Sequence, residues 1–406
     1  MQDKFKSKVG DRVFRVPRVR PWSVPLPVVQ RQKTGAVSPL IIVYGFLGVI
    51  ALGTLLLALP ASSKSGDFTS FTDALFTATS AVCVTGQIVV DTGTYWSSFG
   101  QGVILALIQI GGFGFMTSAT LLLLILGHRI GLRERMLIGE SLSLQRLGGI
   151  LRLIKRIALF TLVAEGIGIV LLLICFWGDS SAGTAIWRSV FHSVSAFNNA
   201  GFDVFGGNSS LIAYRTDVMV VLVTAILIIL GGISFIVMAD VFGVRRLTRL
   251  SLDTKIVLTT TGVLLVIGTI VILVTEYSNL ATLGNLTFSQ KLLDAFFQSV
   301  TARTAGFSTV SIASVADYTL FFTLILMFIG GAVGSTAGGI KVNNFGMLAA
   351  TIWSTIRGRE HASAFGREFS TEQIYRALAI VMLSLGLVVV VVLILTIIED
   401  FTFLDL

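Results

Sequence analysis

The chain has 406 residues, of which 54% are hydrophobic and only 13% are charged, and its formal net charge is +8. Soluble globular domains contain about 25% charged residues, so this composition excludes a water-soluble protein and indicates a polytopic membrane protein. The basic balance does not indicate a nucleic-acid partner. Most Lys and Arg residues lie in segments that alternate with apolar stretches, as the positive-inside rule requires, namely 1–38, 127–156, 243–255 and 356–376.

Apolar stretches long enough to cross about 30 Å of hydrocarbon recur along the chain. We expect spanning helices near 39–59, 99–126, 153–176, 217–241, 254–276, 318–357 (interrupted) and 375–398. Three shorter apolar pieces have the length of re-entrant helices, near 71–81, 186–197 and 290–301. Residues 1–38 are too polar for a signal peptide and are expected to form a basic cytoplasmic arm. This topology places the N-terminus and every basic segment on the cytoplasmic side of the cell membrane.

A unit of span, short helix, glycine turn and span repeats in one direction. Each short helix leads to a single glycine, Gly86, Gly201 or Gly306, and the next span carries a Gly-Gly pair. The predicted pore units are 39–126, 153–241 and 254–357. Residues 375–406 end in FTFLDL, which resembles FTDAL at 71–75, and we expect them to begin an incomplete fourth unit. A fragment of a longer protein is the favoured explanation, and a fourth quadrant supplied from elsewhere is the alternative. The predicted fold is an all-α membrane protein with repeated units around a pseudo-fourfold pore.

The three glycine turns are candidate filters for a cation. Backbone carbonyls can replace the hydration shell of an ion without a buried formal charge, and glycine adopts φ > 0 readily, which lets neighbouring carbonyls point the same way. The short helices direct their partly negative C-terminal ends at the same cavity. The candidate filter residues are Val84, Thr85, Gly86, Asn199, Ala200, Gly201, Thr304, Ala305 and Gly306. Ordinary turns between membrane helices are the alternative, which three turns in register disfavour.

The last predicted unit is interrupted by GGAVGSTAGG, residues 330–339. Non-helical backbone at membrane depth is tolerated only where it is buried in protein or lines a water-filled cavity. We interpret this segment as an intramembrane gating loop below the filter; a static bend that fills space between helices is the alternative. The candidate loop residues are Gly330, Gly331, Gly334, Ser335, Thr336, Gly338, Gly339 and Lys341.

Polar residues in apolar surroundings have several open roles. Lys341 is expected to repel cations, to pair with an acidic neighbour or to extend to the cytoplasmic interface. Arg303 is expected to tie its short helix to a neighbour, because a bare cation in the pathway would oppose conduction. Glu165 is an intramembrane carboxylate and so a candidate functional residue, with a buried hydrogen bond, an ion pair and proton coupling as the alternatives. Asn198 and Asn199 are expected to brace the second turn.

Two other function classes fit the sequence less well. A carrier with discontinuous helices would have inverted repeats and intramembrane charges at the breaks, whereas these repeats run in one direction. An enzyme would need a nucleophile, an acid–base pair or a metal cluster, and the three His residues show no metal-ligand spacing. Cys83 and Cys175 are expected to be free, buried thiols, with a disulfide between them as the alternative. Ion translocation is therefore the leading prediction, and no enzymatic activity is expected.

One known family shares several long motifs with this chain. They include TSAVCVTGQIVVDTGTYWSSFGQ, LIQIGGFGFMT, HSVSAFNNAGF, SVTARTAGF and MFIGGAVGSTAGGIKV. On these motifs the chain resembles the Trk/Ktr/HKT superfamily of potassium transporters, and most closely the KtrB-like membrane subunit of bacterial Ktr systems.

The resemblance implies four pore units around one K⁺ pathway, with Gly86, Gly201 and Gly306 in the filter and 330–339 as the gating loop. It implies uptake stimulated by Na⁺ and no organic cofactor in this chain. It further implies a homodimer in the cell (plasma or inner) membrane, surrounded by lipid, and a cytosolic ring of KtrA-like, nucleotide-binding regulatory subunits of the RCK type against the basic face. The sequence departs from the family in lacking the fourth filter and the helix that follows it.

Overall fold

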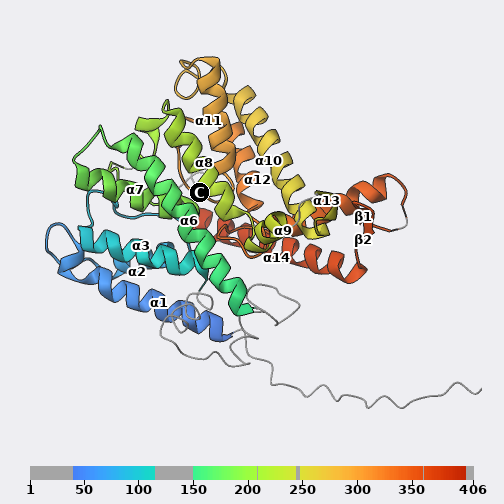
Figure 1. Ribbon diagram of the computed structural model, residues 1–406, viewed down its shortest axis with the longest axis horizontal. Coiled ribbons are helices and arrows are strands. Elements are labelled where there is room, and N and C mark those ends of the chain that lie inside the picture. Colours follow the sequence, from blue (N-terminus) through green and yellow to red (C-terminus); the bar gives the residue numbers. More distant parts are fainter. Residues whose placement is uncertain (1–39, 115–149, 208, 244–246, 360, 399–406) are drawn as a thin grey trace, which may run out of the picture. The chain divides into compact units, whose positions relative to one another are not determined.

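The computed structural model describes residues 40–114, 150–207, 209–243, 247–359 and 361–398. These residues are mostly helical (Figure 1). The sheet among the described residues is a short antiparallel hairpin with two residues in each strand, β1 (Ser363–Ala364) and β2 (Arg367–Glu368). The predicted N-terminal arm, the end of the span 99–126, most of the basic segment 127–156 and the last eight positions lie outside the described residues.

The predicted spans form helices where the sequence is apolar. They are α1 (Leu40–Ala58), α3 (Ser98–Phe113), α6 (Ile150–Phe176), α10 (Leu252–Glu276) and α14 (Thr371–Ile398). By length and hydropathy, α6 from Arg152, α10 and α14 are each sufficient to cross a membrane, and a bent helix pair described below makes a further candidate in the described part of the chain. In α14 only Ala377 is buried among the described residues, so most of its apolar surface is left for lipid or another subunit.

The three short helices of the predicted repeats are α2 (Phe71–Val82), α7 (Ala182–Phe197) and α11 (Phe288–Thr301). Each begins after a hydroxyl residue that caps it: Ser70 and Ser181 accept amide N–H groups of the first turn, and Thr287 forms a capping box with Gln290. These caps start α7 and α11 earlier than the apolar pattern predicts. Each short helix packs against the span that precedes it, as α1 and α2 show in Figure 1.

The predicted continuous span over 217–241 is wrong. The structure contains two helices, α8 (Val218–Gly232) and α9 (Phe235–Gly243), which meet at an angle of 96°. The break releases the carbonyls of Gly231 and Gly232 from the helix, and amides about 100 residues away bind them: Thr336 donates to Gly231 over 3.1 Å and Ala332 to Gly232 over 3.0 Å. A Gly-Gly pair alone weakens a helix by only about 1 kcal/mol per glycine. The pair is therefore not enough to predict a bend within a continuous apolar stretch.

The predicted interruption of 318–357 is confirmed. The helix α12 (Asp317–Phe328) ends before the glycine-rich segment, and α13 (Val342–Ile356) follows it. The ends of the irregular stretch are closed on each other, because Gly330 N–H donates to Ile340 O and Ile340 N–H to Phe328 O, both over 3.0 Å. Short 3₁₀ turns complete the described chain, η1 (Pro60–Ser62), η2 (Ile212–Tyr214), η3 (Leu247–Arg249) and η4 (Ile312–Ser314).

The first glycine of a Gly-Gly pair sets how closely a span approaches the short helix before it. A β-carbon at Gly111 would lie 2.1 Å from the carbonyl oxygen of Val82, and one at Gly231 would lie 1.7 Å from that of Phe197. Val82 and Phe197 are the last residues of α2 and α7. Glycine is therefore required at both positions for the helix end and the span to touch backbone to backbone.

We expect Gly231→Ala to destabilise the fold and Gly232→Ala to be tolerated. The methyl group of the first variant collides with the Phe197 backbone, whereas the nearest atom to a β-carbon at Gly232 is Asn199 Nδ2, at 3.4 Å. Overpacking of this kind costs about 1–3 kcal/mol. Thermal unfolding of the detergent-solubilised proteins, followed by intrinsic fluorescence, measures the difference. Equal melting temperatures for the two variants would contradict the close backbone contact.

Candidate functional site

The three glycine turns share one backbone conformation. In each, a residue other than glycine has positive φ, and the predicted glycine follows two positions later. The φ angles are 55° at Val84, 58° at Asn199, 67° at Thr304, 79° at Gly86, 74° at Gly201 and 82° at Gly306. A left-handed conformation at a residue with a side chain costs about 1–3 kcal/mol and persists where the surroundings enforce it. Contacts with the rest of the protein must therefore stabilise the turns in this conformation.

The turns lie against one another although they are far apart in the sequence. A β-carbon at Gly86 would be 2.4 Å from Ala200 O, one at Gly201 would be 3.0 Å from Ala305 O, and one at Gly306 would be 3.0 Å from the Cα atom of Gly201. Ala200 and Ala305 are buried, whereas Thr85 in the first turn is exposed. The backbone oxygens of the second and third turns thus face neighbouring glycines at van der Waals distance.

Hydroxyl groups of the short helices fix the carbonyl that follows each of two glycines. Ser195 Oγ donates to Phe202 O and Thr301 Oγ1 donates to Phe307 O, each over 2.6 Å. These two bonds fix the orientation of the Phe202 and Phe307 carbonyls at the end of each turn.

Asn198 secures the end of α7 to two other helices. Its Nδ2 atom lies 3.1 Å from Glu165 Oε1, 3.1 Å from Gln109 Oε1 and 2.9 Å from Val194 O. Glu165 is 4% exposed, so this carboxyl accepts a buried hydrogen bond, which was one of the alternatives for it. With its amide oriented to satisfy both polar atoms, Asn199 donates to Ala196 O and Ile228 O. Both asparagines therefore contact the helices that support the second turn.

The segment 330–339 is bonded directly to the turns. Gly338 N–H donates to Thr304 Oγ1 over 3.1 Å, and Thr336 Oγ1 donates to Phe197 O over 3.2 Å. Arg303 Nη2 lies 3.1 Å from Gly330 O, and Arg303 is 8% exposed. A cavity of about 10 Å³ between the segment and the turns is lined by residues that include Asn199, Arg303 and Gly331, which is room for about one water molecule.

Lys341 contacts its own loop. Its Nζ atom donates to Ala337 O over 2.7 Å, and in the described part of the chain it forms no ion pair with a carboxylate. The predicted acidic neighbour is therefore absent among these residues. The ammonium group closes the last turn of the irregular segment, at the start of α13.

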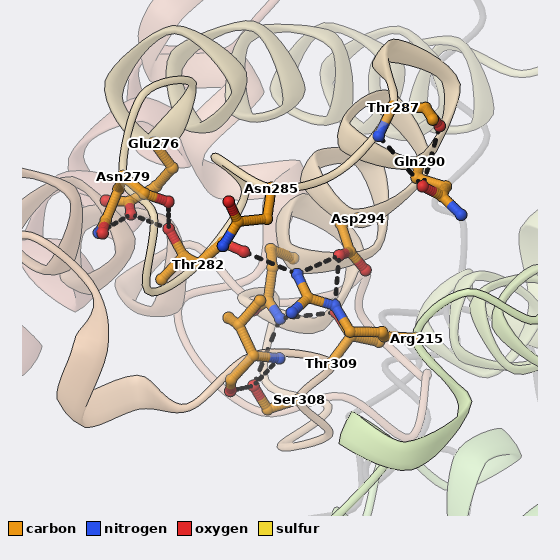
Figure 2. Close-up of polar contacts among 12 residues, drawn as sticks. Arg215, Glu276, Asn279, Thr282, Asn285, Thr287, Gln290, Asp294, Ser308 and Thr309 are labelled. Carbon is orange, nitrogen blue, oxygen red and sulfur yellow. Dashed lines mark hydrogen bonds and ion pairs between the residues drawn. The ribbon is translucent and has the colours of Figure 1, made fainter.

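A buried ion pair positions the third short helix. Figure 2 shows the Arg215 guanidinium directed at Asp294 of α11. Arg215 Nη2 lies 2.9 Å from Asp294 Oδ2 and 2.9 Å from Thr282 O, and the Asp294 side chain is fully buried. Because Arg215 comes 79 positions earlier in the chain, the pair links the segment before α8 to α11. Sequence reasoning missed it, since nothing local couples the two residues.

Glu276, at the end of α10, is held by four hydrogen bonds. Thr282 Oγ1 and Thr319 Oγ1 each donate over 2.6 Å, Asn279 Nδ2 over 2.7 Å and Ala316 N–H over 3.1 Å. Glu276 is 2% exposed, and buried carboxylates require such partners. Figure 2 shows Glu276 with Asn279 and Thr282 around it. Through Thr282 this carboxylate and the Arg215–Asp294 pair brace one loop together.

Asp203 places an acidic group beside the second turn. It follows Gly201 by two residues, in the stretch between α7 and α8, and its Oδ1 atom accepts the Phe205 N–H over 3.0 Å. Burial, together with the negative charge of Asp91, raises the pKa of Asp203 to about 6, although hydrogen bonds from the Phe205 and Gly206 amides act in the opposite direction. The carboxyl is therefore mostly ionised at pH 7 and loses its charge as the pH falls through about 6. An ionised carboxylate at this position favours cations.

The described residues contain no group of three or more His, Cys, Asp or Glu side chains that could hold a metal ion. Cys83 and Cys175 are free, as expected, but the expected burial is wrong, because Cys83 is exposed and Cys175 is only partly buried. The site is thus built from backbone oxygens, hydroxyls and amides, a donor set suited to weakly held hard cations.

We expect Asp294→Ala to destabilise the protein by about 3–5 kcal/mol, because it leaves the partly buried Arg215 without its partner. Asp73→Ala is the matched control: Asp73 lies in the first turn of α2 and forms no ion pair in the described part of the chain. Its loss removes only a helix-dipole contribution of about 0.3–1 kcal/mol. Denaturant unfolding in detergent measures both. A smaller loss for Asp294→Ala than for Asp73→Ala would contradict a positioning role for the pair.

Comparisons with known proteins identify the family of this chain. The TrkH family model, described as a cation transport protein, matches residues 33–405. The Ktr system potassium uptake protein B of Bacillus subtilis is 43% identical over 91% of this chain and 82% of its own length. The potassium/sodium uptake protein NtpJ of Enterococcus hirae is 40% identical over 92% of this chain and 82% of its own length.

A further relative and a solved structure extend the comparison. The Ktr system potassium uptake protein B of Vibrio alginolyticus is 40% identical over 88% of this chain and 78% of its own length. The crystal structure of the potassium transporter TrkH from Vibrio parahaemolyticus matches with a TM-score of 0.64 and 21% identity, over 90% of this chain and 73% of that one, which supports the fold. The chain therefore belongs to the TrkH family of cation transport proteins, as a KtrB-like member of the Trk/Ktr superfamily, and is an integral membrane transporter rather than an enzyme.

Proposed function

We infer that this chain is the ion-translocating subunit of a Ktr-type system that takes up K⁺ across the cell membrane. The observation that carries the proposal is the convergence of the three glycine turns. A β-carbon added to any of the three glycines would lie within about 3 Å of a backbone atom of a neighbouring turn. Backbone oxygens gathered in this way can replace the water around a monovalent cation. The potassium uptake activities in the names of the relatives support the choice of K⁺.

The proposed filter consists of the backbone carbonyls of the three turns. Its residues are Val84, Thr85, Gly86, Asn199, Ala200, Gly201, Thr304, Ala305 and Gly306. Each turn follows the C-terminal end of a short helix, whose partly negative charge favours a cation. We assign the units 39–126, 153–241 and 254–357 to successive quarters of a pseudo-fourfold pore, and the segment that begins at 375 to the fourth.

The segment 330–339 is the proposed gate. Its hydrogen bonds to Thr304 and to the end of α7 place it next to the turns, and Arg303 holds its first residue by the carbonyl. In the closed state the residues Gly330, Gly331, Gly334, Ser335, Thr336, Gly338 and Gly339 fill the path, with Lys341 at its cytoplasmic end. Opening requires these bonds to break so that the segment moves aside.

The remaining parts of the proposal concern assembly. The N-terminus and the basic segments face the cytoplasm, where a nucleotide-binding ring of KtrA-like subunits docks, and two copies of this chain form a homodimer. Uptake is stimulated by Na⁺. The word "system" in the names of the Ktr relatives supports a multi-subunit assembly, and the positive-inside rule supports the orientation.

A growth and uptake assay tests the proposal with a matched pair of glycine variants. Gly86 and Gly66 both have φ of 79°, but a β-carbon at Gly86 meets Ala200 O at 2.4 Å, whereas one at Gly66 meets nothing within 4 Å. In a transport-deficient bacterium that also makes the cytosolic partner, the chain with its predicted fourth unit restored and the Gly66→Ala variant of that chain should both restore growth at limiting K⁺. Gly86→Ala should lower Rb⁺ uptake about tenfold or more, which corresponds to about 1.4 kcal/mol in the barrier. Full uptake by Gly86→Ala at equal expression would exclude the turns as the filter.

A second assay tests the gate. In the protein with its fourth unit restored, deleting residues 331–337 should raise basal K⁺ flux into proteoliposomes, because the bonds that hold the segment against the turns are gone. Thr336→Val, which removes only the hydroxyl bound to Phe197 O, should raise flux to a smaller extent. Thr351→Val is the control, since the Thr351 hydroxyl donates to Met347 O within its own helix. Unchanged flux in the deletion variant would leave the segment as a static bend.

A further inference from the structure

A pocket of about 340 Å³ lies between α6 and α9, apart from the turns. Its wall includes Leu153 and Phe160 of α6 and Phe235, Met238 and Phe242 of α9, and Arg156 is the charged residue among the lining side chains. The volume is in the range of small-ligand sites, about 300–1,000 Å³. An apolar wall with one cation at its edge fits an amphiphile with a negative head.

The surroundings of the pocket are apolar rather than aqueous. On α6, Leu159 and Val163 lie next to the pocket side of the helix and are 64% and 50% exposed, and Phe242 of α9 is 75% exposed. In a spanning helix, exposed apolar side chains of this kind face hydrocarbon chains. The pocket therefore opens toward acyl chains, which can enter it without crossing water.

Arg156 carries the charge that selects the head group. It lies one helical turn, about 6 Å, before Phe160, in the basic stretch with Arg152 and Lys155. Arg156 is exposed and forms no ion pair among the described residues. In the proposed orientation this end of α6 is at the cytoplasmic leaflet, where anionic lipids concentrate, and a basic side chain in contact with a lipid phosphate contributes about 1 kcal/mol of attraction.

The pocket shares residues with the bend that holds the 330–339 segment. Phe235 lines the pocket, and its N–H donates to Gly334 O over 3.4 Å. The Phe160 ring lies 6.5 Å from Phe235, 6.4 Å from Phe242 and 6.2 Å from Phe197. Phe197 in turn accepts the Thr336 hydroxyl. An occupant in contact with Phe160 and Phe235 thus stabilises the α8–α9 bend and the loop bonded to it.

We propose that this pocket binds an acyl chain of an anionic phospholipid from the cytoplasmic leaflet, with its phosphate paired to Arg156, and that bound lipid stabilises the closed position of the 330–339 segment. The regulatory part rests on the gating role proposed above. The lipid site itself does not, because its occupancy can be measured without transport.

Lipid retention tests the site. The protein is reconstituted in vesicles of phosphatidylcholine mixed with phosphatidylglycerol, re-extracted gently and weighed by native mass spectrometry. Arg156→Gln should retain about fivefold less phosphatidylglycerol, the effect of one basic side chain, whereas Lys155→Gln, its neighbour outside the pocket lining, should retain the native amount. Ala239→Trp, which fills the pocket but keeps every charge, should also lose the lipid. Equal retention by all variants would overturn the site and favour a segment of the chain as the cover.

Hydrogen exchange tests the coupling on the same samples. Amides at Phe235 and 330–342 should exchange more slowly in vesicles containing phosphatidylglycerol than in phosphatidylcholine alone, by up to about fivefold, since a ligand shifts an equilibrium only by its differential affinity. The effect should persist in Lys155→Gln and vanish in Arg156→Gln. Retained lipid without any change in exchange would overturn the coupling while leaving the site. A failure of K⁺ uptake with both results intact would instead count against the proposed transport function.

Discussion

A peptide group without a hydrogen-bond partner is costly inside a bilayer, and this constraint governs how the irregular parts of the chain are arranged. In the described part of the chain, two of the expected membrane spans are interrupted, one by the α8–α9 bend and one by the segment 330–339. Each supplies what the other lacks: the bend frees two carbonyls, of Gly231 and Gly232, and the segment presents the amides of Thr336 and Ala332 to them. Each interruption is therefore stabilised by its hydrogen bonds to the other.

The same principle separates the two sides of the turns. Where the short helices are braced, buried carboxylates make the contacts, as Glu276 does with four donors and Asp294 does with Arg215. Where the turns meet the glycine-rich segment, the contacts are single bonds from backbone amides, a hydroxyl and the Arg303 guanidinium. Rigid support on one side and replaceable bonds on the other suit a fixed ligand set next to a movable element.

Much of this architecture could be predicted from the sequence because its signals are local. Apolar length marks the spans, a single glycine after Ser- and Thr-rich short helices marks each turn, and five glycines in ten residues mark the interruption at 330–339. The structure bears out the interruption and the short helices. The assignment of Gly86, Gly201 and Gly306 to a filter stays a prediction, since geometry alone does not report which ion binds.

What the sequence could not predict depends on distant partners. The bend after Gly232 is invisible in an apolar run, because its stabilising amides come from about 100 positions later. The pair Arg215–Asp294 joins residues 79 apart, and Glu276 at the end of a span looks like an ordinary interfacial carboxylate until its donors are seen. Pattern reasoning detects periodicity within a segment, whereas these features are set by contacts between segments.

The hydrogen bonds that hold 330–339 also determine how much potassium leaks through the proposed gate when the transporter is idle. They include the bonds from Ala332 and Thr336 to the α8 end, from Gly338 to Thr304 and from Arg303 to Gly330. At about 0.5–1.5 kcal/mol each, these four bonds alone favour the closed state by roughly 2–6 kcal/mol. With the gate as proposed, roughly one transporter molecule in thirty to one in twenty-five thousand would be open without stimulation. The idle leak of potassium is then set by a few hydrogen bonds, and each one lost multiplies it several-fold.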